Sequence, residues 1–316
     1  MPELMLTGIP GDSPIGAMAA LGVFRVASIV QGAGNVKFAW SKAEPFCPLL
    51  VTPEPLTAGA LIAMLAQHIE GAVERYELTW ADRAKALSAA DFRAHAAKTL
   101  DLGTDGGYYA ANWIVAFGAE AAQGRDEEFV PTPFDTSFAQ QTFPGDFRQL
   151  AKNLHEDPLA LTDSLREAIF GPWMYRDDQH SMGWDPTTVR VHAHSPQAPS
   201  KSKAQGVRAA VWLAFESLPL FPCFPRGRGV QPRGFSCRER QLELCWPIWS
   251  VPVAMGALKS LLGLELVTCA RPNVAEMRAR GIHAVFASRR TRSSKYAVFF
   301  EAARVKARLR AEIHAE

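Results

Sequence analysis

Cysteine is scarce in this sequence of 316 residues, and no Cys-x-x-Cys pair occurs. The set is odd in number and scattered: Cys47, Cys223, Cys237, Cys245 and Cys269. Disulfide frameworks and zinc fingers need paired cysteines at short, regular spacing. Cysteine usage therefore favours reduced thiols in a cytoplasm over either of these two classes.

The glycine-rich motifs of nucleotide-binding enzymes are also missing. The stretch GIPGDSPIGAMAALGVFRV (Gly8 to Val26) has no G-x-x-x-x-G-K-[ST] and no G-x-G-x-x-G, and its one cation, Arg25, comes several turns too late to reach a phosphate. Ser13 as N-cap and Pro14 as first helical residue predict the start of a buried helix instead. No G-x-S-x-G elbow or local Cys and His signature marks a hydrolase. We therefore expect a protein that is not an enzyme and has no cofactor.

Long apolar runs and secretion signals are lacking as well. No run of about 18 uncharged apolar residues occurs, and the N-terminal residues have no basic region followed by an apolar one. We therefore expect a cytoplasmic protein without a membrane partner. A hydrophobic content of 48% is sufficient for a substantial core in one large domain or two ordinary ones.

The net charge of +2 conceals two regions of opposite sign. From residue 201 onward, 20 basic residues face 8 acidic ones, whereas residues 1–200 have 14 basic and 24 acidic residues. The sign changes at the polar stretch 197–205, which predicts an acidic N-terminal domain (1–196) and a basic C-terminal region (206–316). Such asymmetry indicates a polyanionic ligand or an oppositely charged neighbour. The alternative is one compact domain in which the charges mix in space.

Hydrophobic periodicity predicts an α+β fold of helices and short strands. Helices are expected after Pro14, over residues 61–76, 91–100, 162–170, 207–219, 254–264 and 274–280, and at the basic C-terminus. Ser88 and Asp91 form a sequence like a capping box. Strands are expected at 36–40, 244–253 with proline interruptions, 282–288 and 296–300. Residues 103–147 are interpreted as ordered loops with packed aromatic rings, and residues 224–240 as a loop or hairpin.

The densest polar cluster, MYRDDQHSMGWDP, contains Asp177, Asp178, His180 and Asp185. Carboxylate and imidazole groups of this kind hold Mg²⁺ or Mn²⁺ in two-metal nucleases, which gives an alternative function. A solvated loop whose carboxylates cap turns explains the same residues. His192 and His194 share one face of a possible strand, but without a matching pair at zinc spacing they are better explained as polar-face histidines.

Three basic clusters lie in the C-terminal third and point to nucleic acid. They are Lys201, Lys203 and Arg208; Arg226, Arg228 and Arg233; and Arg289, Arg290, Arg292 and Lys295. The second cluster has glycines that allow close approach to a phosphate chain, and no carboxylate occurs between Phe224 and Phe235. Cations beside small hydroxyl side chains and an aromatic ring are the mixture found against nucleic-acid backbones.

The order of the longer motifs resembles that of small proteins associated with type I-G CRISPR systems, formerly I-U. The motifs are G-x-x-x-x-S-P-x-G-x-x-A-A-L-G-V-x-R, YRDDQHSMGWDP, AVWLAFESLPLFP, WPIW and RARGIHAVFASRR. The opening helix is similar to that of the large subunit of these Cascade-type complexes. Because such subunits are longer than this chain, we expect a compact version or an accessory member.

The resemblance implies a part in antiviral defence as a non-enzymatic subunit of a ribonucleoprotein. Its partners would be guide RNA, target DNA and the other effector subunits, and it would help to read the protospacer-adjacent motif. It implies no particular catalytic or ligand residues, so the ten basic residues above are the candidate site on charge and chemistry alone.

Overall fold

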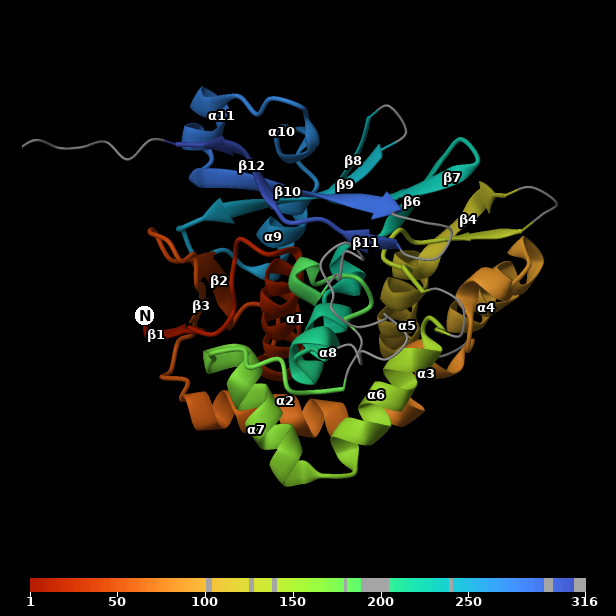
Figure 1. Cartoon of the computed structure of the whole chain (residues 1–316), viewed down its shortest axis with the longest axis horizontal. Coiled ribbons are helices and arrows are strands. Elements are labelled where there is room, and N and C mark those ends of the chain that lie inside the picture. The colour runs from red at the N-terminus through yellow and green to blue at the C-terminus, as the bar shows by residue number, and fades with distance from the viewer. Residues whose placement is uncertain are drawn as a thin grey trace, which may run out of the picture.

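The computed structural model describes residues 1–100, 104–124, 128–137, 141–178, 181–188, 205–238, 241–292 and 298–309. The fold is α+β, as the sequence predicts, with helices and short antiparallel strands in small sheets. Figure 1 shows the largest sheet at the top, the helices α1, α8 and α5 beneath it, and α2, α6 and α7 at the bottom. The molecule is thus built as a sheet on a layer of central helices, with a further helical layer below.

The part of the chain before residue 200 is mainly helical. Its elements are β1 (Glu3–Met5), α1 (Pro14–Gln31), β2 (Lys37–Trp40), β3 (Pro48–Val51), α2 (Ala58–Glu70), the 3₁₀ helix η1 (Ala72–Glu74), α3 (Tyr76–Thr79), η2 (Ala84–Ala86), α4 (Ala89–Leu100), α5 (Thr104–Phe117), β4 (Gly118–Gln123), β5 (Phe129–Pro131), α6 (Gly145–His155), α7 (Pro158–Phe170) and η4 (Pro186–Thr188). Strands β1, β3 and β2 form a three-stranded sheet, and β4 pairs with β5.

The part after residue 204 contains most of the strands. Its elements are α8 (Arg208–Glu216), η7 (Leu218–Leu220), β6 (Cys223–Arg226), β7 (Gly229–Pro232), β8 (Phe235–Arg238), β9 (Gln241–Trp249), α9 (Met255–Leu262), α10 (Glu265–Thr268), α11 (Val274–Ala279), β10 (Ile282–Arg292), β11 (Val298–Phe300) and β12 (Arg304–Arg308). The largest sheet has the order β11-β10-β9-β8, and β12 pairs with β10 next to β11. Strands β6 and β7 form a hairpin.

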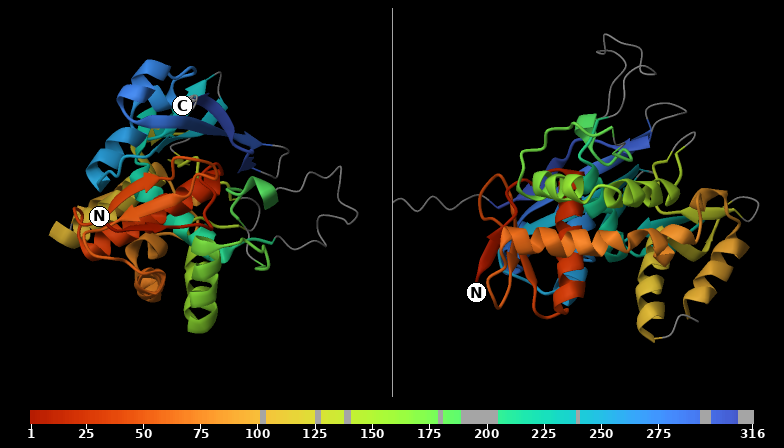
Figure 2. Two further views of the ribbon diagram at one scale, coloured as in Figure 1. Left: turned by 90° about the vertical axis from the view of Figure 1, so that its left-hand side faces the viewer. Right: turned by 90° about the horizontal axis from the view of Figure 1, so that it is seen from below.

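Helices α1 and α8 cross at very short range in the centre of the molecule. A Cβ atom on Gly22 would lie 1.7 Å from the carbonyl oxygen of Leu213, so only glycine allows this approach. Helix α1 is long and apolar enough to cross a membrane, but 83% of that stretch is buried inside the protein. Helix α2 crosses α1 on the side away from the large sheet (Figure 1 and Figure 2). The burial confirms α1 as a core helix.

One hydrophobic core joins the two regions of opposite charge. The largest buried cluster draws on residues from Leu6 to Phe300. Trp246 of β9 donates a hydrogen bond to the carbonyl of Gly11 (2.9 Å), and Trp249 donates one to the carbonyl of Phe38 (3.1 Å). The acidic and basic regions therefore share a core.

Three expectations about local structure are wrong. Residues 104–117, interpreted as loop, form α5, and the basic segment Arg304–Arg308, expected to be helical, is a strand. Strand β9 runs through Pro247 without interruption. Its neighbour β8 pairs only as far as Leu244, so beyond that point β9 has just β10 beside it, and proline is tolerated at such an edge.

The two predicted helix starts differ in how they are capped. Ser13 precedes α1 in extended conformation, but its side chain makes no capping hydrogen bond. At α4 the predicted box is confirmed, because the amide of Ser88 donates to the Asp91 carboxylate (3.1 Å) and the amide of Asp91 donates to the Ser88 hydroxyl (3.0 Å). The hydrogen bonds from Ser88 hold the pKa of the Asp91 carboxyl below its usual value.

Candidate nucleic-acid interface

The hairpin β6–β7 forms one wall of a groove of about 450 Å³ that continues to the end of helix α10. Its lining residues are Phe224, Pro225, Arg226, Gln231, Pro232, Arg233, Gly234, Phe235, Gly263 and Thr268, with no carboxylate among them. Phe224 is 52% exposed, an unusual state for a phenylalanine in a protein with so large a core. The groove thus combines an accessible aromatic ring with two arginines.

The groove arginines are positioned by neutral acceptors. Arg226 donates to the side-chain oxygen of Gln231 and, at 3.5 Å, to the carbonyl of Cys237 on β8. Arg233 donates to the carbonyl of Leu220 (3.4 Å), and partial burial lowers its pKa. Arg228 lies exposed in the tight turn of the hairpin, where Gly227 takes a positive φ of 57°. The contacts of Arg226 and Arg233 with neutral acceptors orient their guanidinium groups without neutralising their charge.

A second group of cations lies on the face of the large sheet that also carries α10 and α11. Glu243 of β9 stands opposite Arg289 of β10, and Arg304 of β12 donates to both of its carboxylate oxygens at 2.8 Å. Lys306 lies on the same face and donates to the carbonyl of Val267 (3.1 Å). We call these four residues, Glu243, Arg289, Arg304 and Lys306, the sheet-face cluster.

The sheet-face cluster has three cations around one carboxylate. Burial would raise the pKa of Glu243, but Arg304, Lys306 and Arg289 outweigh it and hold that pKa below its usual value. The side chain of Glu243 is only 10% exposed, whereas those of Arg289 and Arg304 are 42% and 53% exposed. The Nε donor of Arg289 has no hydrogen-bond partner among the described residues. The accessible part of the cluster is therefore positive.

The remaining members of the predicted Arg289 cluster differ in environment. Arg290 points to the other face of the sheet, where its Nε donates to the carbonyl of Pro133 (2.7 Å) and its Nη2 to that of Asp135 (3.1 Å). Burial lowers the pKa of Arg290. Arg292, at the end of β10, is exposed, and Lys295 lies outside the described residues. Arg290 thus fixes a loop to the sheet, while Arg289 and Arg292 are accessible.

The first predicted basic cluster is represented by Arg208 alone, since Lys201 and Lys203 lie outside the described residues. Arg208 is the first residue of α8, and its backbone amide donates to a carboxylate oxygen of Asp177 at 2.9 Å. Its Nε lies 3.5 Å from the other oxygen of Asp177. Asp177 therefore acts as a cap and an ion-pair partner for Arg208.

The predicted acidic cluster is not assembled as one site in the described part of the chain. Asp185 is buried and accepts hydrogen bonds from the amide (2.9 Å) and hydroxyl (2.7 Å) of Thr187. Asp178 is exposed, and His180, His192 and His194 lie outside the described residues. Among the residues that are described, no group of three or more His, Cys, Asp or Glu side chains is placed to hold a metal ion.

Phe224, Arg304 and Lys306 are absent from the predicted site. The alternation of Arg304, Lys306 and Arg308 in RVKAR is the signal that would have indicated a strand with a cationic face. A register shift places Lys306 between the paired residues Val305 and Ala307, and Arg308 consequently lies on the other face, over the ring of Phe46 and beside Glu44.

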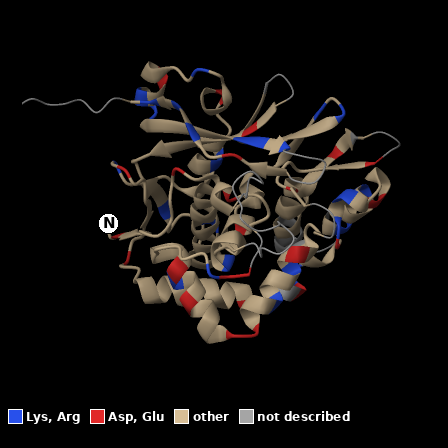
Figure 3. Cartoon of the chain, in the orientation of Figure 1, with Lys and Arg blue, Asp and Glu red and all other residues tan. Residues whose placement is uncertain are grey.

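Figure 3 shows Lys and Arg along β10, β12 and the β6–β7 hairpin at the top of the view, whereas α7 at the bottom carries Asp163 and Glu167 against Arg166, and α6 carries charges of both signs. The charge asymmetry of the sequence is thus partly retained in space. No protein-family model, no curated protein and no solved structure matches this chain.

Proposed function

We propose that this chain is a nucleic-acid-binding subunit of an RNA-guided CRISPR type I effector complex. The observation that carries the proposal is the groove in which exposed Phe224 lies with Arg226 and Arg233, free of carboxylates, beside strand β8 of the large sheet. An exposed aromatic ring offers a stacking surface to any base, and arginines contact the phosphates that flank it. The sequence resemblance to type I-G proteins supplies the type of complex.

The groove and the sheet-face cluster are arranged so that one nucleic-acid strand could contact both. Arg226 contacts Cys237 on β8, and β8 and β9 separate it from the strand that carries Arg289. A nucleic-acid strand that stacks on Phe224 would continue toward Arg289 and Arg304 across the face of the large sheet that carries α10 and α11. Guide pairing supplies sequence specificity in such complexes, so the protein needs cationic contacts and at most a short motif-reading surface.

The stacking contact is tested by replacing Phe224 in the full-length chain. Fluorescence anisotropy with labelled single-stranded DNA and RNA measures the dissociation constant. Phe224→Ala removes the stacking ring, about half of which is exposed, so we expect affinity to fall about 5- to 150-fold, the equivalent of about 1–3 kcal/mol. Phe224→Trp restores a stacking surface and should bind at least as tightly as the wild type.

A matched control is Leu159→Ala, which removes an apolar side chain that is 80% exposed on helix α7. It should leave the affinity unchanged. Equal affinities of Phe224→Ala and Leu159→Ala would exclude the groove from the interface. If neither the chain nor its complex bound an oligonucleotide, the proposed function itself would be wrong.

The electrostatic part is tested by the salt dependence of binding. Each phosphate contact contributes about 0.7 to the slope of log K against log salt for a single strand. Arg228→Ala and Arg289→Ala should each lower the slope by about that amount if these arginines contact phosphates. Arg166→Ala changes the net charge equally, but its helix α7 lies on the side of the molecule opposite the hairpin (Figure 1), so the slope should match that of the wild type.

A further inference from the structure

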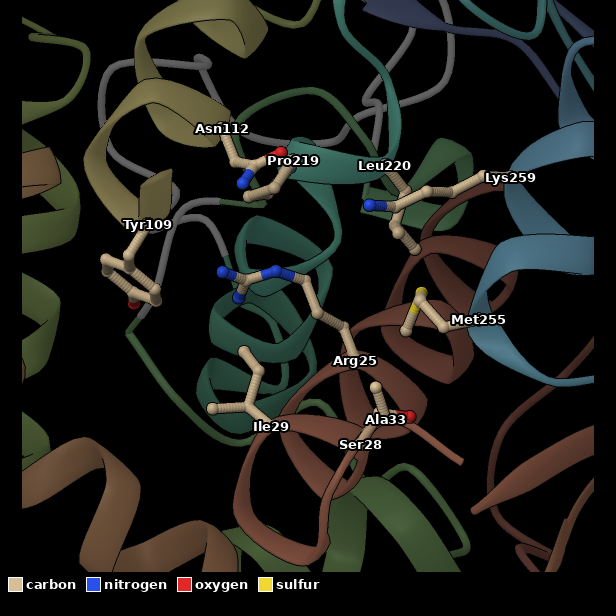
Figure 4. Close-up of a pocket in the computed structure, with 10 residues that line it drawn as sticks. All are labelled: Arg25, Ser28, Ile29, Ala33, Tyr109, Asn112, Pro219, Leu220, Met255 and Lys259. Atoms are coloured by element: carbon tan, nitrogen blue, oxygen red, sulfur yellow. The ribbon is translucent and has the colours of Figure 1, made fainter. Parts of the chain in front are cut away.

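A second cavity, of about 600 Å³, lies between helices α1, α5 and α9 and the 3₁₀ helix η7. It adjoins the groove at the hairpin, because Leu220 of its wall accepts the hydrogen bond of Arg233, but the two share no lining residue. Its lining residues are Arg25, Ser28, Ile29, Ala33, Tyr109, Asn112, Pro219, Leu220, Met255 and Lys259. Two of them are cations and none is a carboxylate. Figure 4 shows the side chains of Arg25 and Lys259 extending into the cavity from different helices.

Arg25, the one charged residue of helix α1, is held at the cavity wall by several contacts. Its Nη1 donates to the carboxylate of Glu216 at 2.8 Å and to the backbone carbonyl of the same residue at 3.3 Å. The guanidinium carbon also lies 5.0 Å from the ring centre of Trp113 and 5.5 Å from that of Tyr109, distances typical of cation–π contacts. The group is therefore oriented before any ligand arrives.

Glu216 also pairs with two other basic side chains. It is fully buried, and Arg75 donates to its other oxygen at 2.6 Å while Nε2 of His68 lies 3.1 Å away. Burial would raise the pKa of Glu216, but Arg75, His68 and Arg25 outweigh it and hold the pKa far below its usual range. Because the carboxylate is shared, it balances only part of the positive charge of Arg25.

Ser28 gives independent evidence of a polar ligand. It follows Arg25 by three residues on α1, so both side chains lie on the same face of the helix and line the cavity. Ser28 is only 4% exposed, and its hydroxyl oxygen has no hydrogen-bond partner among the described residues. A buried hydroxyl without a partner costs about 1–3 kcal/mol, so this one is a ready donor for a polar group, from water or a ligand, that enters the cavity.

Lys259 on α9 supplies the second charge from the other side. No acidic side chain within the described part of the chain forms an ion pair with it, and no carboxylate lines the cavity around it. The rest of the wall is apolar, with Ile29, Leu220 and Met255 facing the same space. The size of the cavity falls in the range of small-molecule sites, which join an apolar wall to a few positioned polar groups.

We propose that this cavity binds a small organic anion with an apolar body. The charged head group accepts hydrogen bonds from Arg25, Ser28 and Lys259, and the apolar body packs on Ile29, Leu220 and Met255. A cation is disfavoured by both charged wall residues. A neutral apolar molecule leaves the Ser28 hydroxyl and the Lys259 ammonium unpaired. The cavity has lining residues of its own, distinct from those of the nucleic-acid groove, and this proposal does not depend on the proposed function.

The test uses two fluorescent probes of nearly the same shape. 8-Anilinonaphthalene-1-sulfonate has a sulfonate, and N-phenyl-1-naphthylamine has the same rings without it. We expect the wild-type chain to bind the sulfonate with a stoichiometry of one and at least about tenfold more tightly than the uncharged probe, since an ion pair at a partly buried site is worth one or more factors of ten.

Two variants assign the contacts within the native fold. Lys259→Met keeps the apolar stem but removes the charge, and should weaken the sulfonate about tenfold while leaving the uncharged probe unchanged. Ser28→Ala should weaken the sulfonate several-fold. Lys152→Met on α6 is the matched control, because it removes an exposed lysine from a helix that does not line the cavity, and should change neither affinity.

Binding of both probes with equal affinity, or sulfonate binding that is the same in Lys259→Met as in Lys152→Met, would overturn the proposal. To separate this cavity from other apolar surfaces, Met255→Trp fills it with a larger ring. Loss of the stoichiometric sulfonate site in a Met255→Trp chain with native circular dichroism supports the cavity. Retention of the site in that variant places the binding elsewhere and refutes the assignment.

Discussion

A single buried carboxylate, Glu216, connects three basic side chains from three different segments, all more than 140 residues before it in the sequence. Arg25 comes from α1, His68 from α2 and Arg75 from the turn before α3. Removing one partner of a buried ion pair typically costs about 3–5 kcal/mol, because the other partners keep their charge without compensation. We therefore expect Glu216→Gln to lower the free energy of unfolding by about that amount, measured by urea denaturation at neutral pH.

The same residue predicts a pH dependence. The folded-state pKa of Glu216 is lowered, so its contribution is complete above the pKa of about 4.3 of an unfolded glutamate and is lost progressively as the pH falls below that value. The wild type should lose this stability in acid, and Glu216→Gln should show a flatter profile below about pH 4.3. Glu276→Gln, at an exposed ion pair with Arg280 (3.2 Å), is the control and should keep the wild-type profile. Parallel profiles for all three proteins would refute this assignment.

At the scale of elements, the crossing of α1 and α8 depends on one glycine. A methyl group at Gly22 would overlap the carbonyl of Leu213 at 1.7 Å and approach the Cβ of Glu216 at 3.3 Å. We expect Gly22→Ala to lower the free energy of unfolding by about 1–3 kcal/mol or more, because the two helices must move apart. The same movement should disturb the ion pair of Arg25 and Glu216. Thermal unfolding followed by circular dichroism measures the effect.

The control for this substitution is Gly59→Ala in helix α2. Nothing lies within 4 Å of the position that its Cβ would take, so the higher helix propensity of alanine should leave stability unchanged or raise it by up to about 1 kcal/mol. If both alanine variants melted at the wild-type temperature, the two helices would not be in the close contact described.

Elements with a clear period in the sequence were predicted, and those defined by distant contacts were not. The apolar residues of α1 and the alternation in β2 and β10 are local signals, and these elements were found. Helix α5 begins with TDGGYY, a glycine-rich and aromatic segment that local propensity assigns to a loop. Its later residues pack on the core, as the stacking of Trp113 on Phe215 shows, and that tertiary contact overrides the propensity.

In the candidate site, too, the features that depend on local sequence were predicted and those that depend on distant contacts were not. Charge and glycine content identified the hairpin and its arginines, because those properties are local. The surroundings of the hairpin were not predictable, since Gly263 and Thr268 reach the groove from segments more than 25 residues later in the sequence.

The capping role of Ser13 was predicted from residue type alone and is wrong, because the side chain makes no hydrogen bond to the helix. Ser13→Ala should therefore cost less than the typical 1 kcal/mol of a lost cap, measured by urea denaturation.

At the scale of the whole molecule, opposite charge in two halves of a chain does not require two independent domains. Helix α1 belongs to the acidic half and α8 to the basic half, yet each buries its surface mainly against the other. Strand β2 is likewise joined to the segment after β9 by paired hydrogen bonds between Phe38 and Val253, at 2.8 and 2.9 Å. Separating the halves would expose this apolar surface on both and leave Glu216 without Arg25.

We therefore expect the protein to unfold in one cooperative transition. Tryptophans occur in both halves, among them Trp113 and Trp246, so fluorescence reports on the whole core, while circular dichroism follows the helices, most of which lie before residue 200. The two signals should give the same midpoint in urea, and the calorimetric enthalpy should equal the van't Hoff enthalpy. Gly22→Ala should shift both signals together, because its effect passes through the shared core. Two resolved transitions, only one of them shifted by Gly22→Ala, would mean that the acidic and basic regions fold independently despite the contacts between α1 and α8.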